Sequence, residues 1–240
     1  MLSPDQARQL SDLNERFVNA KAEEILSFFS DLYGNELAFA TSLGAEDQVL
    51  TFLLSQINKD VRIFTLDTGR LFPETIDLID KTNKLYDINI LVYFPEFSLV
   101  EKMVNSKGIN LFYESIENRE ECCHIRKIIP MKRALKGVKA WVSGLRSEQS
   151  VTRQDLSVVS WDEKFELVKI NPLLNWTETQ LWDFIKTHDI PYNELHDKGY
   201  PSIGCQPCTR AVRPGDDVRG GRWWWEMPEN KECGLHKRDN

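Results

Sequence analysis

The chain has 240 residues, a net charge of −7 and 41% hydrophobic residues, which is enough for one sizeable core. The negative charge argues against a general nucleic-acid binder, because binding to a phosphate backbone requires a broad basic surface. The apolar runs, such as residues 88–94, are far shorter than the roughly 20 residues that a membrane helix needs. The N-terminus has the pattern of a polar helix and lacks the apolar segment of a signal peptide, so we expect a soluble, cytoplasmic protein.

The first half of the chain alternates predicted helices and strands. Residues 1–30 have apolar side chains at helical spacing, and Ser3-Pro4-Asp5 is a typical helix start. There follow a strand at 36–41, a loop at 42–47, a helix at 48–57, a strand at 61–66, a helix at 73–85 and a strand at 88–94. This alternation predicts an α/β fold, with a twisted parallel sheet flanked by helices.

The second half adds a strand at 139–143, a hairpin formed by 158–159 and 165–170, and a helix that Thr177 caps and that runs to Lys186. We expect residues 1–190 to form the core, and 191–240 to be a Cys- and Trp-rich segment of the same domain. Ligands of such sheets bind beyond the carboxyl ends of the strands. The loops at 42–47, 67–70 and 144–153 should therefore line one crevice.

Five cysteines in an intracellular chain indicate metal binding or redox chemistry rather than a disulfide scaffold. Cys122 and Cys123 are adjacent in a predicted helix that starts near Arg119, and Cys205 and Cys208 form a C-x-x-C turn. Neighbours on a helix diverge by about a quarter turn, so they need an extended ligand body. An iron–sulfur cluster meets this need best, and a zinc site with four thiolate ligands or buried free thiols are the alternatives.

Cys233 stands apart from the other four, near the C-terminus, where chains tend to be mobile. His236 and the upstream arginines could lower the pKa of its thiol and make the thiolate available at neutral pH. We therefore predict a reactive cysteine, with an unpaired surface cysteine as the alternative.

Two loops and several arginines suit an anionic ligand. Residues 42–47 join a strand to a helix, and their backbone N–H groups could hold a phosphate or sulfate, although an ordinary tight turn has the same pattern. The loop at 67–70 follows the next strand. Guanidinium groups bind oxyanions through paired hydrogen bonds, so four arginines of the second half are suited to a nucleotide that carries phosphate and sulfate. The alternative is that they are solvated surface residues. They are Arg146, Arg153, Arg219 and Arg222.

Several stretches together identify a family. The matching stretches are Ser42–Asp47, Leu66–Arg70, Cys122–Lys127, Gly144–Arg146 with Thr152-Arg153, Tyr200–Thr209, Gly221–Glu226 and Glu232–His236. From about Leu37 to His236 the chain resembles the adenylyl-sulfate and phosphoadenylyl-sulfate reductases of sulfate assimilation and cysteine biosynthesis, which belong to the adenine-nucleotide α-hydrolase-like superfamily.

The resemblance implies that Cys122, Cys123, Cys205 and Cys208 hold one 4Fe-4S cluster and that Cys233 is the catalytic nucleophile. Having both cysteine pairs favours adenylyl sulfate over its 3′-phosphorylated form. The resemblance also implies substrate-binding residues. Lys127, Arg219, Arg222 and His236 match positions near the sulfate and phosphate, Ser42 and Gly44 belong to the phosphate loop, and Asp67, Thr68, Gly69, Arg70 and Gly144 match the nucleoside loops.

In the implied reaction the Cys233 thiolate attacks the sulfur of adenylyl sulfate, AMP leaves, and a thioredoxin-type dithiol protein then releases sulfite. One alternative is a phosphoadenylyl-sulfate reductase that produces sulfite and adenosine 3′,5′-bisphosphate. A second is an ATP-dependent sulfurtransferase of the same fold, against which Leu43, Ala45 and Glu46 count, because ATP-splitting relatives have Ser-Gly-Gly-x-Asp-Ser in this loop. A zinc-stabilised nucleotide-binding module without chemistry is the third. Neither nucleic acid nor membrane is an expected partner, and assembly into a homo-oligomer is left open.

Overall fold

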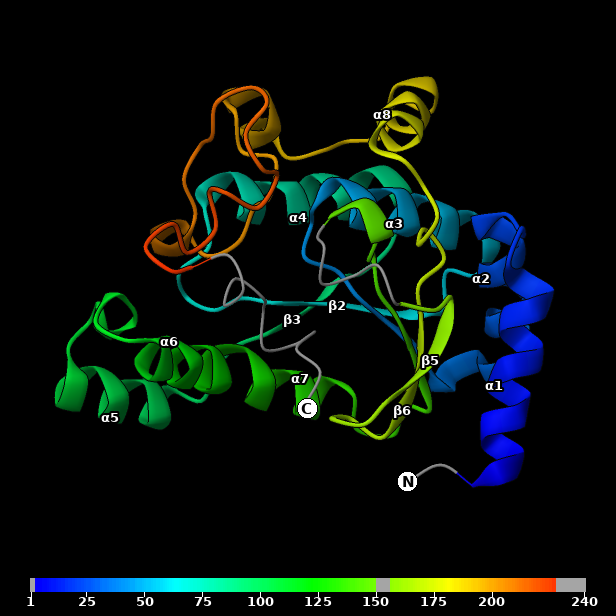
Figure 1. Cartoon of the computed structure of the whole chain (residues 1–240), viewed down its shortest axis with the longest axis horizontal. Coiled ribbons are helices and arrows are strands. Elements are labelled where there is room, and N and C mark those ends of the chain that lie inside the picture. The colour runs from blue at the N-terminus through cyan, green and yellow to red at the C-terminus, as the bar shows by residue number, and fades with distance from the viewer. Residues whose placement is uncertain (1–2, 150–155, 228–240) are drawn as a thin grey trace. The chain divides into compact units, whose positions relative to one another are not determined.

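A computed structural model of the chain describes residues 3–149 and 156–227 (Figure 1). These residues form a six-stranded sheet in the order β3-β2-β1-β4-β6-β5. The strands are β1 (Leu37–Ala40), β2 (Arg62–Leu66), β3 (Leu91–Tyr93), β4 (Ala140–Val142), β5 (Val159–Asp162) and β6 (Leu167–Ile170). The pairs β1–β2, β1–β4 and β4–β6 are parallel, and β5 pairs antiparallel with β6. The predicted α/β class is confirmed, and the predicted hairpin supplies the antiparallel edge.

Strand β3 is shorter than the predicted strand at residues 88–94. Asn83, on helix α4 (Pro73–Tyr86), is the reason: its side-chain oxygen accepts a hydrogen bond from the Ile90 N–H at 2.9 Å, and its carbonyl accepts one from the Ile88 N–H at 3.2 Å. These two N–H groups are bound to the helix and not to a neighbouring strand. The strand therefore begins at Leu91.

The chain divides into two compact units, each made of three segments. Unit 1 comprises Met1–Phe64, Asp77–Leu91 and Gly137–Asn193, and unit 2 comprises Thr65–Ile76, Val92–Lys136 and Glu194–Asn240. The last segment of unit 2 begins close to the boundary predicted at residue 191. That the chain forms one domain overall stays a prediction.

Unit 1 contains the larger apolar core. Helices α1 (Pro4–Phe17), α2 (Ala22–Tyr33), α3 (Ala45–Ile57) and α8 (Glu178–Thr187) belong to it. Helix α3 packs against α2 and α8. Ser3 and Thr177 cap α1 and α8 with complete capping boxes, as their sequences predict. Helix α3 starts at Ala45, three residues before the predicted start, which shortens the loop after β1.

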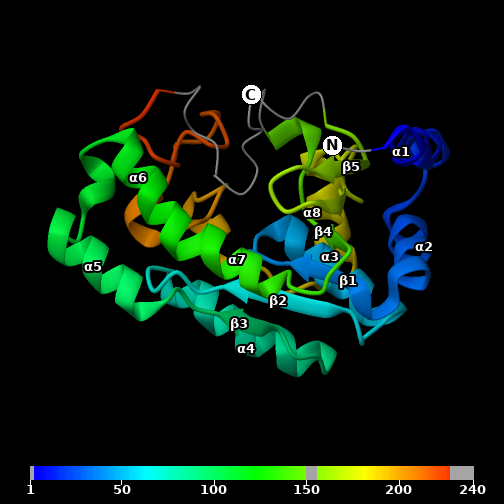
Figure 2. The ribbon, with the colours of Figure 1, turned by 90° about the horizontal axis from the view of Figure 1, so that it is seen from below.

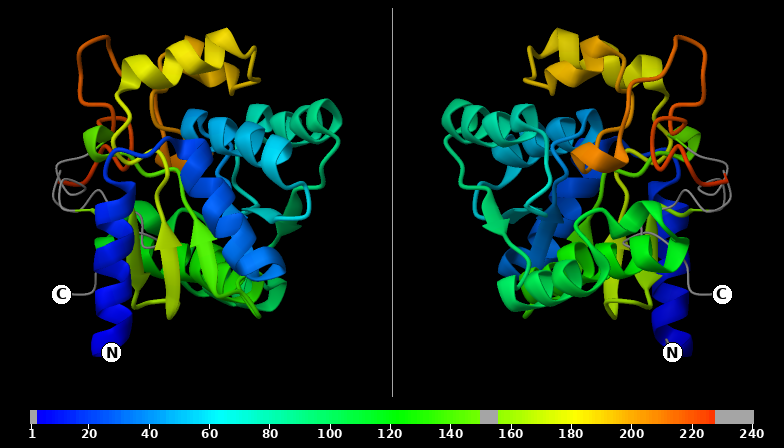
Figure 3. Two further views of the ribbon diagram at one scale, coloured as in Figure 1. Left: turned by 90° about the vertical axis from the view of Figure 1, so that its right-hand side faces the viewer. Right: turned by 90° about the vertical axis from the view of Figure 1, so that its left-hand side faces the viewer.

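Helix α1 covers the outer edge of the sheet, beside β5 (Figure 3). The Asn14 side chain donates to the Val159 carbonyl at 2.8 Å and accepts from the Val159 N–H at 2.9 Å. An edge strand otherwise presents unpaired backbone groups that invite pairing with other chains. Asn14 of α1 thus pairs with backbone groups of the edge strand β5.

Unit 2 contains a smaller core around Met103, Leu111, Phe112 and Trp223. Its helices are α5 (Phe97–Lys107), α6 (Ile116–Cys123) and α7 (Ile129–Ala134), and Figure 2 shows α7 continuing the line of α6. The sequence pattern does not predict α5, because its only buried residue is Met103. In both units, no helix among the described residues is long and apolar enough to cross a membrane.

Candidate active site

The loop after β1 is closed by Asp47. One carboxylate oxygen of Asp47 accepts hydrogen bonds from the Ser42 N–H at 2.5 Å and from the Ser42 hydroxyl at 2.6 Å. Leu43 takes a left-handed backbone conformation with φ of 60°, and Gly44 is the N-cap of α3. A left-handed bulky residue is strained, which is common in loops that carry function. An internal carboxylate therefore already binds Ser42, one of the predicted phosphate-binding residues.

Gly144 lies directly against the start of α3. A Cβ atom at this position would clash with a carboxylate oxygen of Asp47 and would lie 3.1 Å from the Cβ of Glu46. Only glycine allows so close an approach. The structure thus brings two of the predicted substrate loops, 42–47 and the one that begins at Gly144, together in unit 1.

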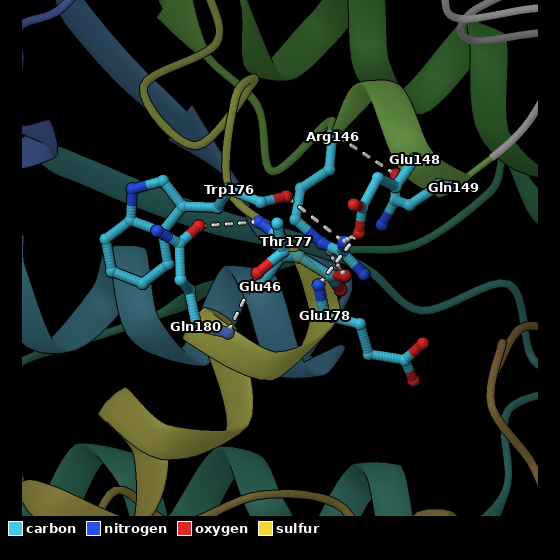
Figure 4. Close-up of polar contacts among 8 residues, drawn as sticks. All are labelled: Glu46, Arg146, Glu148, Gln149, Trp176, Thr177, Glu178 and Gln180. Carbon is cyan, nitrogen blue, oxygen red and sulfur yellow. Dashed lines mark hydrogen bonds and ion pairs between the residues drawn. The ribbon is translucent and has the colours of Figure 1, made fainter.

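Arg146 is buried in a network of unit 1, with 4% of its surface exposed (Figure 4). Its Nε donates to Glu46 at 2.8 Å, and its Nη1 donates to the Trp176 carbonyl at 3.3 Å and to Glu148 at 3.4 Å. The same Glu148 oxygen accepts from the N–H of Glu178 at the start of α8, at 2.9 Å. Two carboxylates therefore balance this guanidinium, and its predicted contact with substrate stays a prediction.

The loop after β2 belongs to unit 2, where it meets the C-x-x-C turn. The Thr68 hydroxyl lies 3.2 Å from the sulfur of Cys205, and the Arg70 carbonyl accepts from the Gln206 N–H at 2.8 Å. Asp67 accepts from the Gly69 N–H at 2.8 Å. The Arg70 side chain donates to the Ile109 carbonyl and to the Asn110 side chain, each at 3.2 Å. This predicted nucleoside loop is therefore bonded to a segment that carries two of the cysteines.

The two cysteine pairs line one cavity in unit 2. Cys122 and Cys123 end helix α6, which widens into a π-helical turn over His124–Ile128. Such turns are rare and are often found at functional sites. Cys205 precedes, and Cys208 ends, a short 3₁₀ turn that Pro207 helps to start. Four thiols from segments far apart in the sequence thus face a common space.

Every charged residue that lines this cavity is a cation; they are Arg70, Arg119, Arg126, Lys127 and Arg222. Arg126 is buried and donates to the Thr68 carbonyl at 2.6 Å, and its positive charge lies close enough to Cys122 to affect the pKa of that thiol. Burial raises the pKa of the Cys122 thiol, and the positive charge of Arg126 acts in the opposite direction. The cavity is therefore lined by positive charges only, although Arg119 is paired with Glu226, which does not line it.

Arg222 and Trp223 also line this cavity, and each has a buried N–H group without a partner in the described part of the chain. Arg222 Nη1 donates to the Ile203 carbonyl at 3.1 Å, and its guanidinium lies so close to Gly204 that a Cβ there would clash with it. Arg222 Nε and Trp223 Nε1 are buried without a hydrogen-bond partner among the described residues. A buried unsatisfied donor costs about 1–3 kcal/mol. An acceptor from outside the described residues would satisfy these two N–H groups.

Cys208 is a poor thiolate in this protein without a bound group. Burial raises the pKa of its thiol to about 12, with further contributions from Cys205 and Cys123, although Lys127 and Arg222 act to lower it. A thiolate here needs a cationic metal centre to replace its proton. Binding of a metal centre to Cys208 would therefore release a proton.

The donor set fits an anionic group that is bound through sulfur. Four thiols, cationic side chains and two unpartnered N–H groups surround one space, and N–H donors commonly bind the sulfur atoms of iron–sulfur clusters. Among the described residues, no three or more His, Cys, Asp or Glu side chains are placed to hold a single metal ion. The cysteines are thus brought to one cavity, but the identity of the bound group stays a prediction.

Three predicted site residues, Arg153, Cys233 and His236, lie outside the described residues. Lys127 lines the cavity, and the guanidinium of Arg219 lies 5.9 Å from the centre of the Trp223 ring. Arg126 was not among the predicted site residues, although it follows Cys122 by four residues on the same helical stretch. Nor was the pair of Arg119 and Glu226, which are 107 residues apart and carry no local signal.

The chain matches one family model and is similar to several known proteins. Residues 36–211 match the model of the phosphoadenosine phosphosulfate reductase domain. An adenosine 5′-phosphosulfate reductase of Allochromatium vinosum is 53% identical, over 85% of this chain and 80% of its own. A crystal structure of the phosphoadenylyl-sulfate reductase of Candida auris superimposes with a TM-score of 0.74 at 30% identity, covering 88% of this chain and 98% of its own.

A yeast FAD synthetase shares the fold alone, with a TM-score of 0.56 at 17% identity over 85% of this chain and 68% of its own. This likeness agrees with the expected adenine-nucleotide α-hydrolase-like fold. Arg219, Arg222 and Cys233 lie beyond the range that the family model matches. The match nevertheless covers more than half of the chain, which belongs to the phosphoadenosine phosphosulfate reductase domain family.

Proposed function

We propose that this chain reduces adenylyl sulfate to sulfite and AMP in sulfate assimilation. The cavity of unit 2 carries the proposal, because its charged lining residues are all cations and four thiols face it. The relative from Allochromatium vinosum, named for this substrate, supports the choice of adenylyl sulfate over the 3′-phosphorylated form.

The cofactor in this proposal is one 4Fe-4S cluster on Cys122, Cys123, Cys205 and Cys208. Adjacent cysteines at a helix end need a ligand body wider than one ion, and this favours a cluster over zinc. When bound, the cluster joins the two cysteine pairs and supplies an electrostatic field near the anionic end of the substrate. Arg126 and the N–H groups of Arg222 and Trp223 are the residues that would donate to its sulfur atoms.

The cations have the roles expected for a substrate that carries both sulfate and phosphate. Lys127 and Arg222 line the cavity, and Arg219 lies beside Trp223. Fixed positive charge lowers the barrier where negative charge develops, which here is the bridging oxygen that leaves with the phosphate. Preorganised donors of this kind cost no reorganisation during the reaction.

Cys233 is the proposed nucleophile. Its thiolate sulfur forms a bond to the sulfur of adenylyl sulfate, the bond from that sulfur to the bridging oxygen breaks, and AMP leaves with the electron pair. The product is an S-sulfocysteine. A thiolate of a dithiol protein then attacks the sulfur of Cys233, sulfite leaves with the electron pair, and the second thiol resolves the mixed disulfide. The dithiol is oxidised and supplies both electrons.

Thioredoxin or a similar dithiol protein is the proposed reductant, since the second step requires a protein disulfide couple of low potential. A cytoplasmic location belongs to the same proposal. A reducing compartment keeps thioredoxin reduced and keeps the five cysteines of this chain free of disulfides.

The test is sulfite release from adenylyl sulfate and from phosphoadenylyl sulfate by anaerobically purified protein with reduced thioredoxin. We expect turnover with adenylyl sulfate and an absorbance band near roughly 400 nm from the cluster. Cys233→Ser should keep the band and lose turnover. Cys208→Ser, the matched control among the other cysteines, should lose both.

Four other outcomes of this test would contradict parts of the proposal. Turnover with phosphoadenylyl sulfate only would assign the reaction of the Candida auris relative, in which adenosine 3′,5′-bisphosphate leaves instead of AMP. Sulfite production by Cys233→Ser would remove that residue from the mechanism. Failure to release sulfite from either nucleotide would overturn the proposal and favour a sulfurtransferase. Zinc without an absorbance band would overturn the cluster.

A further inference from the structure

Arg222 spans the C-x-x-C turn of unit 2. Its backbone forms an antiparallel bridge with Thr209, the residue after Cys208. Its side chain extends to the segment just before Cys205, where Nη1 donates to the Ile203 carbonyl at 3.1 Å. Arg222 is buried, so the position of its side chain depends on the space that the surrounding residues leave for it.

The guanidinium of Arg222 lies directly against the backbone of Gly204. A Cβ atom at Gly204 would clash with Nη2, Cζ and Nη1 of Arg222, and these are the three atoms nearest to it. The same guanidinium lies over the ring of Trp223, with Cζ 4.7 Å from the ring centre. A side chain at position 204 and the present position of the guanidinium therefore exclude each other.

Conformational freedom of the backbone does not explain a glycine at this position. The φ of Gly204 lies outside the positive range that favours glycine, unlike the φ of 70° at Gly69 in the same unit. An alanine could therefore adopt the same backbone conformation. What Gly204 supplies is the space that the guanidinium of Arg222 occupies.

The C-x-x-C turn keeps its own hydrogen bonds without the side chain of Arg222. The Cys205 carbonyl accepts from the Cys208 N–H and from the Thr209 hydroxyl, each at 2.9 Å. The bridge between Thr209 and Arg222 is made by the backbone and does not involve the guanidinium. Displacement of the guanidinium should therefore leave the cysteines of this turn in place and change only where the positive charge lies.

The position of the guanidinium also decides which of its N–H groups can bind a ligand. Nη1 of Arg222 is bonded to the Ile203 carbonyl, whereas the buried Nε has no hydrogen-bond partner among the described residues. Arg222 lines the cysteine cavity. In the proposed function its charge stabilises the bridging oxygen that leaves with the phosphate, and such stabilisation requires a donor that is already in place.

We propose that Gly204 is a positioning residue, which directs Arg222 to the anionic group of the substrate by leaving space for the guanidinium. The inference rests on the proposed function, since it takes Arg222 as one of the cations that stabilise the leaving phosphate. Gly204 itself touches neither the substrate nor the reacting atoms. Its effect passes through Arg222, which distinguishes it from a glycine that only supports the fold.

The experiment is a double-mutant cycle on kcat/KM for sulfite release from adenylyl sulfate, with anaerobically purified protein and reduced thioredoxin. Gly204→Ala should lower kcat/KM about tenfold, because a displaced charge loses part of the stabilisation that its removal abolishes. In an Arg222→Gln background the same substitution should change kcat/KM less than about twofold, since glutamine lacks the Cζ and Nη atoms that the new Cβ would meet. Iron content and absorbance near roughly 400 nm should stay at the level of the unchanged protein.

A crystal structure of Gly204→Ala provides a measurement that does not depend on activity. It should show the guanidinium of Arg222 displaced from the Ile203 carbonyl, while the two cysteines of the turn keep their positions. Gln206→Ala is the matched control, because Gln206 is an exposed residue of the same turn. This control should leave both kcat/KM and the position of Arg222 unchanged.

Equal losses from Gly204→Ala in both backgrounds would overturn the proposal, and so would an unchanged kcat/KM in Gly204→Ala alone. A guanidinium that stays in place, or a loss of iron in this variant, would also overturn it, since the glycine would then serve the backbone or the cysteine turn. Failure of the unchanged protein to release sulfite would overturn the proposed function and this proposal with it, a result distinct from losses that are confined to the variants.

Discussion

Each unit buries an arginine network, and the two networks differ in how their charge is balanced. In unit 1, Arg146 faces the carboxylates of Glu46 and Glu148, and a carbonyl takes a further hydrogen bond. In unit 2, the charged residues around the cysteine cavity are all cations, and Arg222 keeps a buried Nε without a partner among the described residues. Arg146 is thus paired with carboxylates in unit 1, whereas in unit 2 Glu226 pairs with Arg119 and Arg222 keeps an N–H group without a partner among the described residues.

The difference separates a structural role from a binding role. A buried charge is tolerated when it is paired, and an unpaired one is expensive unless a ligand completes it. The network of Arg146 is complete without any ligand and ties the loop after β4 to the starts of α3 and α8. In unit 2 the buried Nε of Arg222 has no partner among the described residues, which is one reason why we propose this cavity for the anionic cofactor and the anionic substrate.

The largest effect that we expect is a loss of stability when Arg146 is replaced. Arg146→Met should lower the free energy of unfolding by about 3 kcal/mol, because it leaves the half-buried Glu46 carboxylate without its partner. Urea unfolding of the cluster-free protein measures it. Adding Glu46→Gln to the same protein should recover much of the loss, since both charges are then gone.

The same variant decides the role that sequence analysis gave to Arg146. If Arg146 holds substrate, Arg146→Met should weaken binding of adenylyl sulfate while unfolding stays as it was. That result would break the comparison, because the network of unit 1 would then have charge available for a ligand.

Arg222 should show the opposite pattern, with a smaller effect on stability and a clear effect on activity. Arg222→Gln should reduce kcat/KM for sulfite release about a hundredfold, or by about 2.7 kcal/mol, which is typical for removal of one preorganised charge. Unfolding of the cluster-free protein should change by less than about 1 kcal/mol, because the lost guanidinium was incompletely paired. Unfolding that falls as far as for Arg146→Met would contradict the contrast between the units.

Strands and helix starts that depend on short-range patterns were predictable from the sequence. Apolar periodicity gave the strands β1, β2 and β4, and capping residues gave the starts of α1 and α8. The sequence does not predict that Asn83 binds the backbone at Ile90 and shortens β3. Side-chain bonds of this kind depend on where a helix ends in space.

The candidate site shows the same limit. The cysteine spacing indicated a common ligand, but the pairing of Arg119 with Glu226 spans 107 residues and depends on tertiary packing. The loop after β1 had the pattern of an anion site, yet its closure by Asp47 comes from a side chain within the helix that follows. Residue type predicts which chemistry is available, and only the fold decides which charges cancel.

Substitution of Glu148 should have the smallest effect of these variants. It tests which carboxylate is the main counter-charge of Arg146. Its side chain is 52% exposed, and its 3.4 Å contact with Arg146 is long, so this ion pair should contribute little. Its 2.9 Å hydrogen bond from the Glu178 N–H also places a negative charge at the start of α8. Glu148→Gln should therefore lower the free energy of unfolding by about 0.5–1 kcal/mol, with sulfite release unchanged. A loss as large as that of Arg146→Met would mean that Glu148, and not Glu46, is the main counter-charge of the network.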